Sequence, residues 1–173
     1  MAANGDFDLM KLFENGTVDS QTIVSHDSSI KRIAESLLLY TGKERDSTDI
    51  HRGQISNSEA NMHAFDKMKT LAEEAPKAIY DGDLDMLAKL IRDNWTLKRS
   101  LSNKINAEWI DRLYSDALRL GAKGGKVVGA GGGGFLLLVA EPEKHEAIAK
   151  GLGLVKTDFK FSHSGSRVIF VGD

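Results

Sequence analysis

The stretch that decides the fold is Gly124-Gly125-Lys126-Val127-Val128-Gly129-Ala130-Gly131-Gly132-Gly133-Gly134-Phe135-Leu136-Leu137-Leu138-Val139. Its glycine-rich centre separates two short apolar segments that have the composition of strands. Because glycine has no Cβ, consecutive glycines can adopt positive φ and direct several N–H groups into one concave surface. Such a loop either binds a phosphate-like anion or forms a hairpin without a ligand, and the residues alone leave both interpretations open.

Two common phosphate-binding motifs do not fit this stretch. Gly129-x-Gly131-x-x-Gly134 has the letters of a dinucleotide fingerprint, but that motif requires a helix directly after it. Here the run from Phe135 to Val139 predicts a buried strand. A Walker loop also fails, because Leu120 stands at its first glycine and Val127 replaces its Ser or Thr.

The composition excludes several classes of protein. The 173 residues suit one domain spanning 1–173, and 23 Lys and Arg nearly balance 25 Asp and Glu. We therefore expect no nucleic-acid partner and no binding to a membrane surface. The chain has no cysteine and no apparent signal peptide, so we expect a cytoplasmic protein.

No metal site is predicted from the histidines. The chain has five of them, and they are scattered without HExxH or paired spacing. No apolar run approaches the length of a membrane span. We expect the histidines to be surface or capping residues.

The order of elements predicts an α+β fold. We expect strands over 7–13, 18–24 and 36–40, with a turn at Asn15-Gly16, and then a long loop over 43–56. Amphipathic helices are expected over 58–79, 84–101 and 106–120, and a shorter helix over 143–152 follows Pro142. Strands over 155–161 and 167–171 complete an antiparallel sheet with helices packed on one face.

Several stretches resemble the GHMP kinases, the superfamily of galactokinase, homoserine, mevalonate and phosphomevalonate kinases. The glycine stretch from Gly121 to Phe135 is similar to the third motif of this family. The supporting stretches are Leu39-Tyr40-Thr41-Gly42-x-x-Arg45, Trp95-x-Leu97-Lys98-x-Ser100-Leu101-Ser102 and Phe159-x-Phe161-x-x-x-Gly165-Ser166-x-Val168-Ile169. Within the family the sequence is most similar to sugar kinases acting on D-glycero-D-manno-heptose phosphate.

The resemblance implies a ferredoxin-like C-terminal lobe of a two-lobed kinase. The family's Pro-x-x-x-Gly-Leu-Gly-Ser-Ser-type ATP loop has no counterpart here, and its catalytic aspartate is expected just before Met1. We therefore expect a lobe separated by a split gene, by degradation or by the choice of expression boundaries. ATP and Mg²⁺ would serve the complete enzyme, and the expected partners are the N-terminal lobe, a second copy of the chain and a sugar phosphate.

The resemblance also supplies the candidate site residues. The loop expected to face phosphate or substrate comprises Gly129, Ala130, Gly131, Gly132, Gly133 and Gly134. Arg45 and Lys98 are candidates for sugar-phosphate contacts, since Arg binds phosphate bidentately and Lys acts as a point charge. No catalytic residue is assigned to this chain, and two functions remain open: a half-enzyme inactive alone, and a non-catalytic sugar-phosphate-binding or interaction domain.

Overall fold

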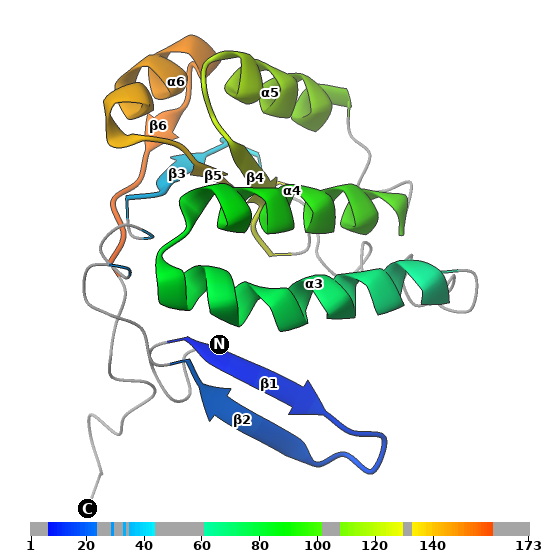
Figure 1. Ribbon diagram of the computed structural model, residues 1–173. Helices are drawn as coiled ribbons and strands as arrows, with labels where there is room; N and C mark the ends of the chain where they lie inside the picture. Colours follow the sequence, from blue (N-terminus) through cyan, green and yellow to red (C-terminus); the bar gives the residue numbers. More distant parts are fainter. Residues whose placement is uncertain are drawn as a thin grey trace, which may run out of the picture.

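A four-stranded antiparallel sheet lies at the centre of the structure (Figure 1). The computed structural model describes residues 7–23, 29, 33, 35–43, 61–101, 108–129 and 133–160. The strands lie in the order β4 (Gly124–Val127), β5 (Phe135–Val139), β3 (Leu37–Tyr40) and β6 (Val155–Lys156). The two strands that flank the glycine loop are therefore direct neighbours, as the sequence predicts.

Helices α5 (Glu108–Arg119) and α6 (His145–Leu152) cover one face of this sheet. Residues that pair across antiparallel strands point to the same face of the sheet. The pairs Leu37–Leu138 and Leu39–Leu136 both lie on this face. All four leucines are at most 1% exposed, and they pack with Ile110 and Ile148 of the two helices. Each such side chain contributes about 1.5–3 kcal/mol by leaving water.

Helix α4 (Leu84–Ser100) packs on the opposite face, along β4. Gly124 pairs with Val139, and Val139 packs with side chains of α4 and of α3 (Met62–Asp81). A Cβ at Gly124 would lie only 2.3 Å from the backbone oxygen of Ala88, so glycine permits this close approach of helix and strand. The predicted α+β class is confirmed, but helices lie on both faces at β4 rather than on one.

The link between α3 and α4 follows its predicted capping. Gly82 has φ +64° and its N–H bonds to carbonyls at the end of α3. The Asp83 side chain accepts a 3.0 Å hydrogen bond from the Met86 N–H in the first turn of α4. Gly121 likewise has positive φ just after α5. These boundaries confirm the expected helix ends.

A second, two-stranded sheet consists of β1 (Asp8–Leu12) and β2 (Val18–Thr22), joined through the predicted turn at Asn15-Gly16. Phe7 and Ile23 at its open end pack against the α3–α4 core, whereas Leu12, Phe13 and Val18 are more than half exposed. This ribbon projects alongside α3 (Figure 1).

Some predicted elements are shorter in the structure or lie outside the described residues. Strand β6 covers only Val155–Lys156, and the segment before α6 is a 3-10 helix, η1 (Pro142–Lys144). The expected strand over 167–171 and most of the loop over 43–56 lie outside the described residues. Within the described ranges, none of the helices combines the length and hydropathy that a membrane crossing requires.

Candidate functional site

The glycine loop joins the ends of β4 and β5 at one end of the sheet. The described glycines on either side of its centre have positive φ: +77° at Gly129, +156° at Gly133 and +86° at Gly134. L side chains rarely adopt this backbone region, so glycine is required by conformation here. Ala130, Gly131 and Gly132, which the sequence analysis placed at the ligand-facing turn, lie outside the described residues.

Residues just after β3 hold the second half of the loop. The Thr41 N–H and hydroxyl donate to the Gly134 carbonyl at 2.8 and 2.9 Å, and the Gly134 N–H donates to the Lys43 carbonyl at 2.6 Å. A Cβ at Gly133 would lie 2.5 Å from that same Lys43 oxygen. The loop is thus fixed against the backbone of residues 41–43, and Thr41 is almost fully buried in doing so.

Lysines surround the described part of the loop. Lys98, in the last turn of α4, donates a hydrogen bond to the Gly129 carbonyl. The Lys43 ammonium lies 4.5 Å from the centre of the Trp109 ring, a cation–π contact. Lys126, in the middle of β4, lies on the α4 face of the sheet because it is two residues from Gly124. This concentration of positive charge favours anions.

Burial changes the acidity of two of these lysines. Burial, with a smaller effect from the positive charge of Lys126, lowers the pKa of Lys98 to about 8. Burial also lowers the pKa of Lys126. The opposite holds for Lys123, because its ion pairs with Asp85 and Glu141, both at 2.7 Å, raise its pKa. Lys98 and Lys126 thus have lowered pKa values, whereas the ion-paired Lys123 has a raised pKa.

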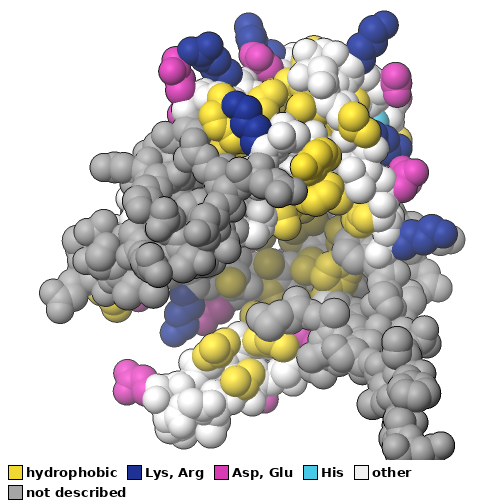
Figure 2. Space-filling model, turned by 180° about the vertical axis from the view of Figure 1, so that it is seen from behind, with side chains coloured by type: hydrophobic (Ala, Val, Ile, Leu, Met, Phe, Trp, Pro, Cys, Tyr) yellow, Lys and Arg dark blue, Asp and Glu magenta, His cyan; other side chains and the backbone are white. Residues whose placement is uncertain are grey.

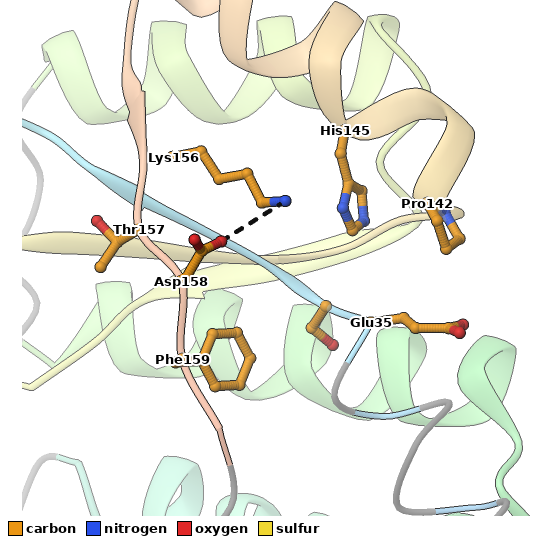
Figure 3. Close-up of a pocket in the computed structure, with 8 residues that line it drawn as sticks. Glu35, Pro142, His145, Lys156, Thr157, Asp158 and Phe159 are labelled. Atoms are coloured by element: carbon orange, nitrogen blue, oxygen red, sulfur yellow. Dashed lines mark ion pairs between the residues drawn. The ribbon is translucent and has the colours of Figure 1, made fainter.

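A separate pocket of about 240 Å³ lies at the other end of the sheet (Figure 3). Glu35, His145, Lys156 and Asp158 line it, and the Lys156 ammonium is 3.8 Å from the Asp158 carboxylate. It lies beside the Leu37–Leu138 pair, whereas the glycine loop begins beyond the Tyr40–Phe135 pair. Because two of the side chains that line this pocket are carboxylates, the pocket does not favour the binding of an anion.

The structure therefore brings together some predicted site residues and adds others. Gly129 and Lys98 are in contact, while Arg45 lies outside the described residues, two positions after Lys43. Sequence reasoning missed Thr41, Lys43 and Lys126 as site residues, although Thr41 and Lys126 lie within the stretches that carry the family resemblance. Among the described residues, no group of three His, Asp or Glu could hold a metal ion.

Solved structures share this fold. The crystal structure of a D-glycero-D-manno-heptose 1-phosphate kinase from Bacteriodes thetaiotaomicron matches with a TM-score of 0.68 at 23% identity, covering 95% of this chain and 45% of that chain. A structure of L. major mevalonate kinase in complex with R-mevalonate gives a TM-score of 0.68 at 20% identity, covering 90% of this chain and 49% of that chain. At these identities the likeness establishes the fold.

The sequence comparisons indicate the same family. A D-glycero-alpha-D-manno-heptose 7-phosphate kinase of Campylobacter jejuni is 28% identical over 171 residues, which are 95% of this chain and 50% of the relative. The chain thus spans half the length of that relative. Residues 72–153, which begin within α3 and end just after α6, match the family described as GHMP kinases C terminal.

Proposed function

We propose that this chain supplies the C-terminal half of an ATP-dependent sugar kinase that acts on a heptose phosphate. The observation that carries the proposal is a glycine loop with positive φ, fixed to residues 41–43 and in contact with Lys98, within the segment 72–153 that matches the GHMP kinases C terminal family. The similarity to the heptose 7-phosphate kinase of Campylobacter jejuni supports a phosphorylated heptose as substrate.

Phosphoryl transfer depends on positioning and on stabilising charge more than on covalent chemistry. In our proposal, backbone N–H groups of the loop over 129–134 orient a phosphate, and Lys98 and Arg45 add positive charge. ATP supplies the phosphoryl group when it is bound. Among the described residues, no group of three His, Asp or Glu side chains could hold a metal ion alone. By the family resemblance, we assign Mg²⁺ and the general base to the other half of the kinase.

An exposed apolar surface supports a partner for this half. Leu12, Phe13 and Val18 are 78%, 52% and 56% exposed on the β1–β2 ribbon. Figure 2 shows hydrophobic side chains on the ribbon and in the hollow above it. Large exposed apolar patches are typical of interaction surfaces. We propose that the N-terminal kinase half covers this surface, and that the chain self-associates when that half is absent.

A non-catalytic sugar-phosphate-binding domain is the second candidate. It is favoured by one observation: among the described residues, no group of three His, Asp or Glu side chains could hold a metal ion. In this case the chain binds the ligand and transfers no phosphoryl group in any combination.

Phosphorylation assays separate these functions. The assay measures ATP-dependent phosphorylation of heptose 7-phosphate by the chain alone and by the chain mixed with an N-terminal kinase half. We expect turnover only in the mixture. Turnover by the chain alone would overturn the half-enzyme proposal, and an inactive mixture of two folded halves would favour the non-catalytic domain.

A matched pair of glycine variants assigns the turnover to the loop. Gly129 and Gly153 have φ of +77° and +64°, and a Cβ on either would meet no atom within 4 Å. The two substitutions to valine therefore impose similar strain, but Gly153 caps α6 away from the loop. We expect Gly129→Val to lower turnover at least tenfold, a barrier increase of about 1.4 kcal/mol, and Gly153→Val to leave it unchanged. Equal turnover in both variants would remove the loop from the active site.

A further inference from the structure

An apolar groove of about 200 Å³ lies between α3 and α4. Aliphatic side chains of both helices form most of its lining, among them Leu71, Ala72 and Ile91. Two polar side chains complete it, Asn94 of α4 and Lys126 of β4. Exposed apolar surface of this kind is typical of sites that bind a partner.

The Lys126 ammonium group determines which charge suits an occupant of this groove. Lys126 is partly buried, and none of the described carboxylates forms an ion pair with it. Burial lowers the pKa of Lys126, because a positive charge is costly when it is held out of water. A fitting occupant therefore combines apolar side chains with a carboxylate.

The end of the β1–β2 ribbon has this composition. Leu12 and Val18 pair across the two strands, so they lie on the same face, and both are more than half exposed. Glu14, in the turn, is exposed as well and forms no ion pair with a described side chain. We call Leu12, Val18 and Glu14 the ribbon tip.

The apolar pair of the ribbon tip points away from the groove of its own chain. Side chains alternate between the two faces of a strand, and Leu12 is five positions from Phe7, so these two side chains lie on opposite faces. Phe7 packs against the α3–α4 core, which leaves Leu12 and Val18 on the outer face. Figure 1 shows the turn of the ribbon lying apart from the helices. Without the N-terminal half, a second copy of the chain is the molecule that brings a ribbon tip to the groove.

We infer that the isolated chain forms a symmetric dimer in which the ribbon tip of each copy lies in the α3–α4 groove of the other. Leu12 and Val18 contact the aliphatic walls of the groove, and the Glu14 carboxylate supplies the counter-charge for Lys126. The exchange is reciprocal, so each dimer contains the contact twice and forms a closed assembly. The inference rests on the proposed function for the self-association of the half kinase, and it names the surfaces that meet.

Cysteine cross-linking tests this contact in the whole chain. The chain has no cysteine of its own, so Leu12→Cys and Ala72→Cys each introduce a single thiol, one on the ribbon tip and one in the groove. We expect a mixture of the two variants to form a disulfide between positions 12 and 72 under mild oxidation. The matched control pairs Leu12→Cys with Ala147→Cys, which changes an exposed alanine of α6. We expect at least tenfold less cross-linked dimer in the control, and equal amounts would overturn the inference.

A charge exchange tests the pairing of Glu14 with Lys126. Sedimentation equilibrium measures the dimer dissociation constant of Glu14→Lys, of Lys126→Glu and of their equimolar mixture. Each variant alone brings like charges together in both contacts, so we expect dimers at least tenfold weaker than those of the wild-type chain. In the mixed dimer both contacts again join an acid and a base, and we expect an affinity within threefold of the wild-type value. A mixture as weak as the single variants would overturn the pairing, and the cross-linking test holds even where Lys126→Glu does not fold.

The N-terminal kinase half separates the failure of this inference from the failure of the proposed function. Because that half is proposed to cover the same ribbon, we expect its addition to dissociate the cross-linkable dimer. An inactive two-half mixture, with the dimer and its cross-link as expected, would refute only the proposed function. An active two-half kinase whose C-terminal half sediments alone as a monomer at 0.1 mM would refute only this dimer.

Discussion

Replacing Gly133 with alanine tests how firmly the glycine loop is fixed. Gly133 has φ +156°, and its new Cβ would lie 2.5 Å from the Lys43 backbone oxygen, which cannot move like a flexible side chain. The backbone strain costs about 1–3 kcal/mol. Displacing the Lys43 carbonyl also weakens its 2.6 Å hydrogen bond from the Gly134 N–H, a further loss of about 0.5–1.5 kcal/mol. We expect Gly133→Ala to lower the free energy of unfolding by about 1.5–4.5 kcal/mol in total.

Gly134→Ala is the matched control. Gly134 has φ +86°, but a Cβ there would meet no atom within 4 Å. Only the conformational strain remains, which is about 1–2 kcal/mol. Urea unfolding of both variants, followed by circular dichroism, measures the difference. If Gly133→Ala costs no more than Gly134→Ala, the Lys43 carbonyl does not restrain the loop, and the description of how the loop is fixed is wrong.

Three further predictions concern the helices around the site. The pKa of Lys98 is about 8 in the folded chain and 10.5 in its ordinary state, so the unfolded chain binds more protons between these pH values and the free energy of unfolding rises with pH there. Urea midpoints measured at pH 7, 8.5 and 10 should therefore rise less in Lys98→Met than in the wild-type chain. An equal rise in both would contradict the lowered pKa. Gly124→Ala should lower the melting temperature and loosen α4, because the Cβ would lie 2.3 Å from the Ala88 oxygen; unchanged melting would contradict that packing. Asp83→Ala should cost about 1 kcal/mol in urea unfolding, because it removes the hydrogen bond to Met86 that caps α4, and a cost near zero would show that the cap is not formed.

Local patterns in the sequence predicted most of the elements. Helical periodicity located α3, α4 and α5. Gly82-Asp83 marked the boundary between the first two, because Gly82 ends α3 and Asp83 caps α4 through hydrogen bonds to residues a few positions away. The glycine loop was found because its run of glycines is itself a local pattern.

The features that sequence reasoning missed depend on tertiary contacts. An amphipathic pattern shows which face of α4 is buried, but not which face of the sheet it meets, so the burial of Lys126 beneath α4 was not predicted. Alternation over 155–161 predicted a long strand, yet within the described residues 155–160 the strand β6 pairs only through Val155 and Lys156, opposite the end of β3. The role of Thr41 could not be found locally, because Thr41 and Gly134 are 93 positions apart.

The central claim is that the glycine loop and its lysines bind phosphate. Titration of the ¹⁵N-labelled chain with heptose 7-phosphate, followed by amide chemical shifts, tests it most directly. We predict the largest shifts at Gly129, Gly133 and Gly134, and none at Gly153, the capping glycine of α6. Shifts confined to the His145–Lys156 pocket at the opposite end of the sheet, with the loop amides unmoved, would contradict the account.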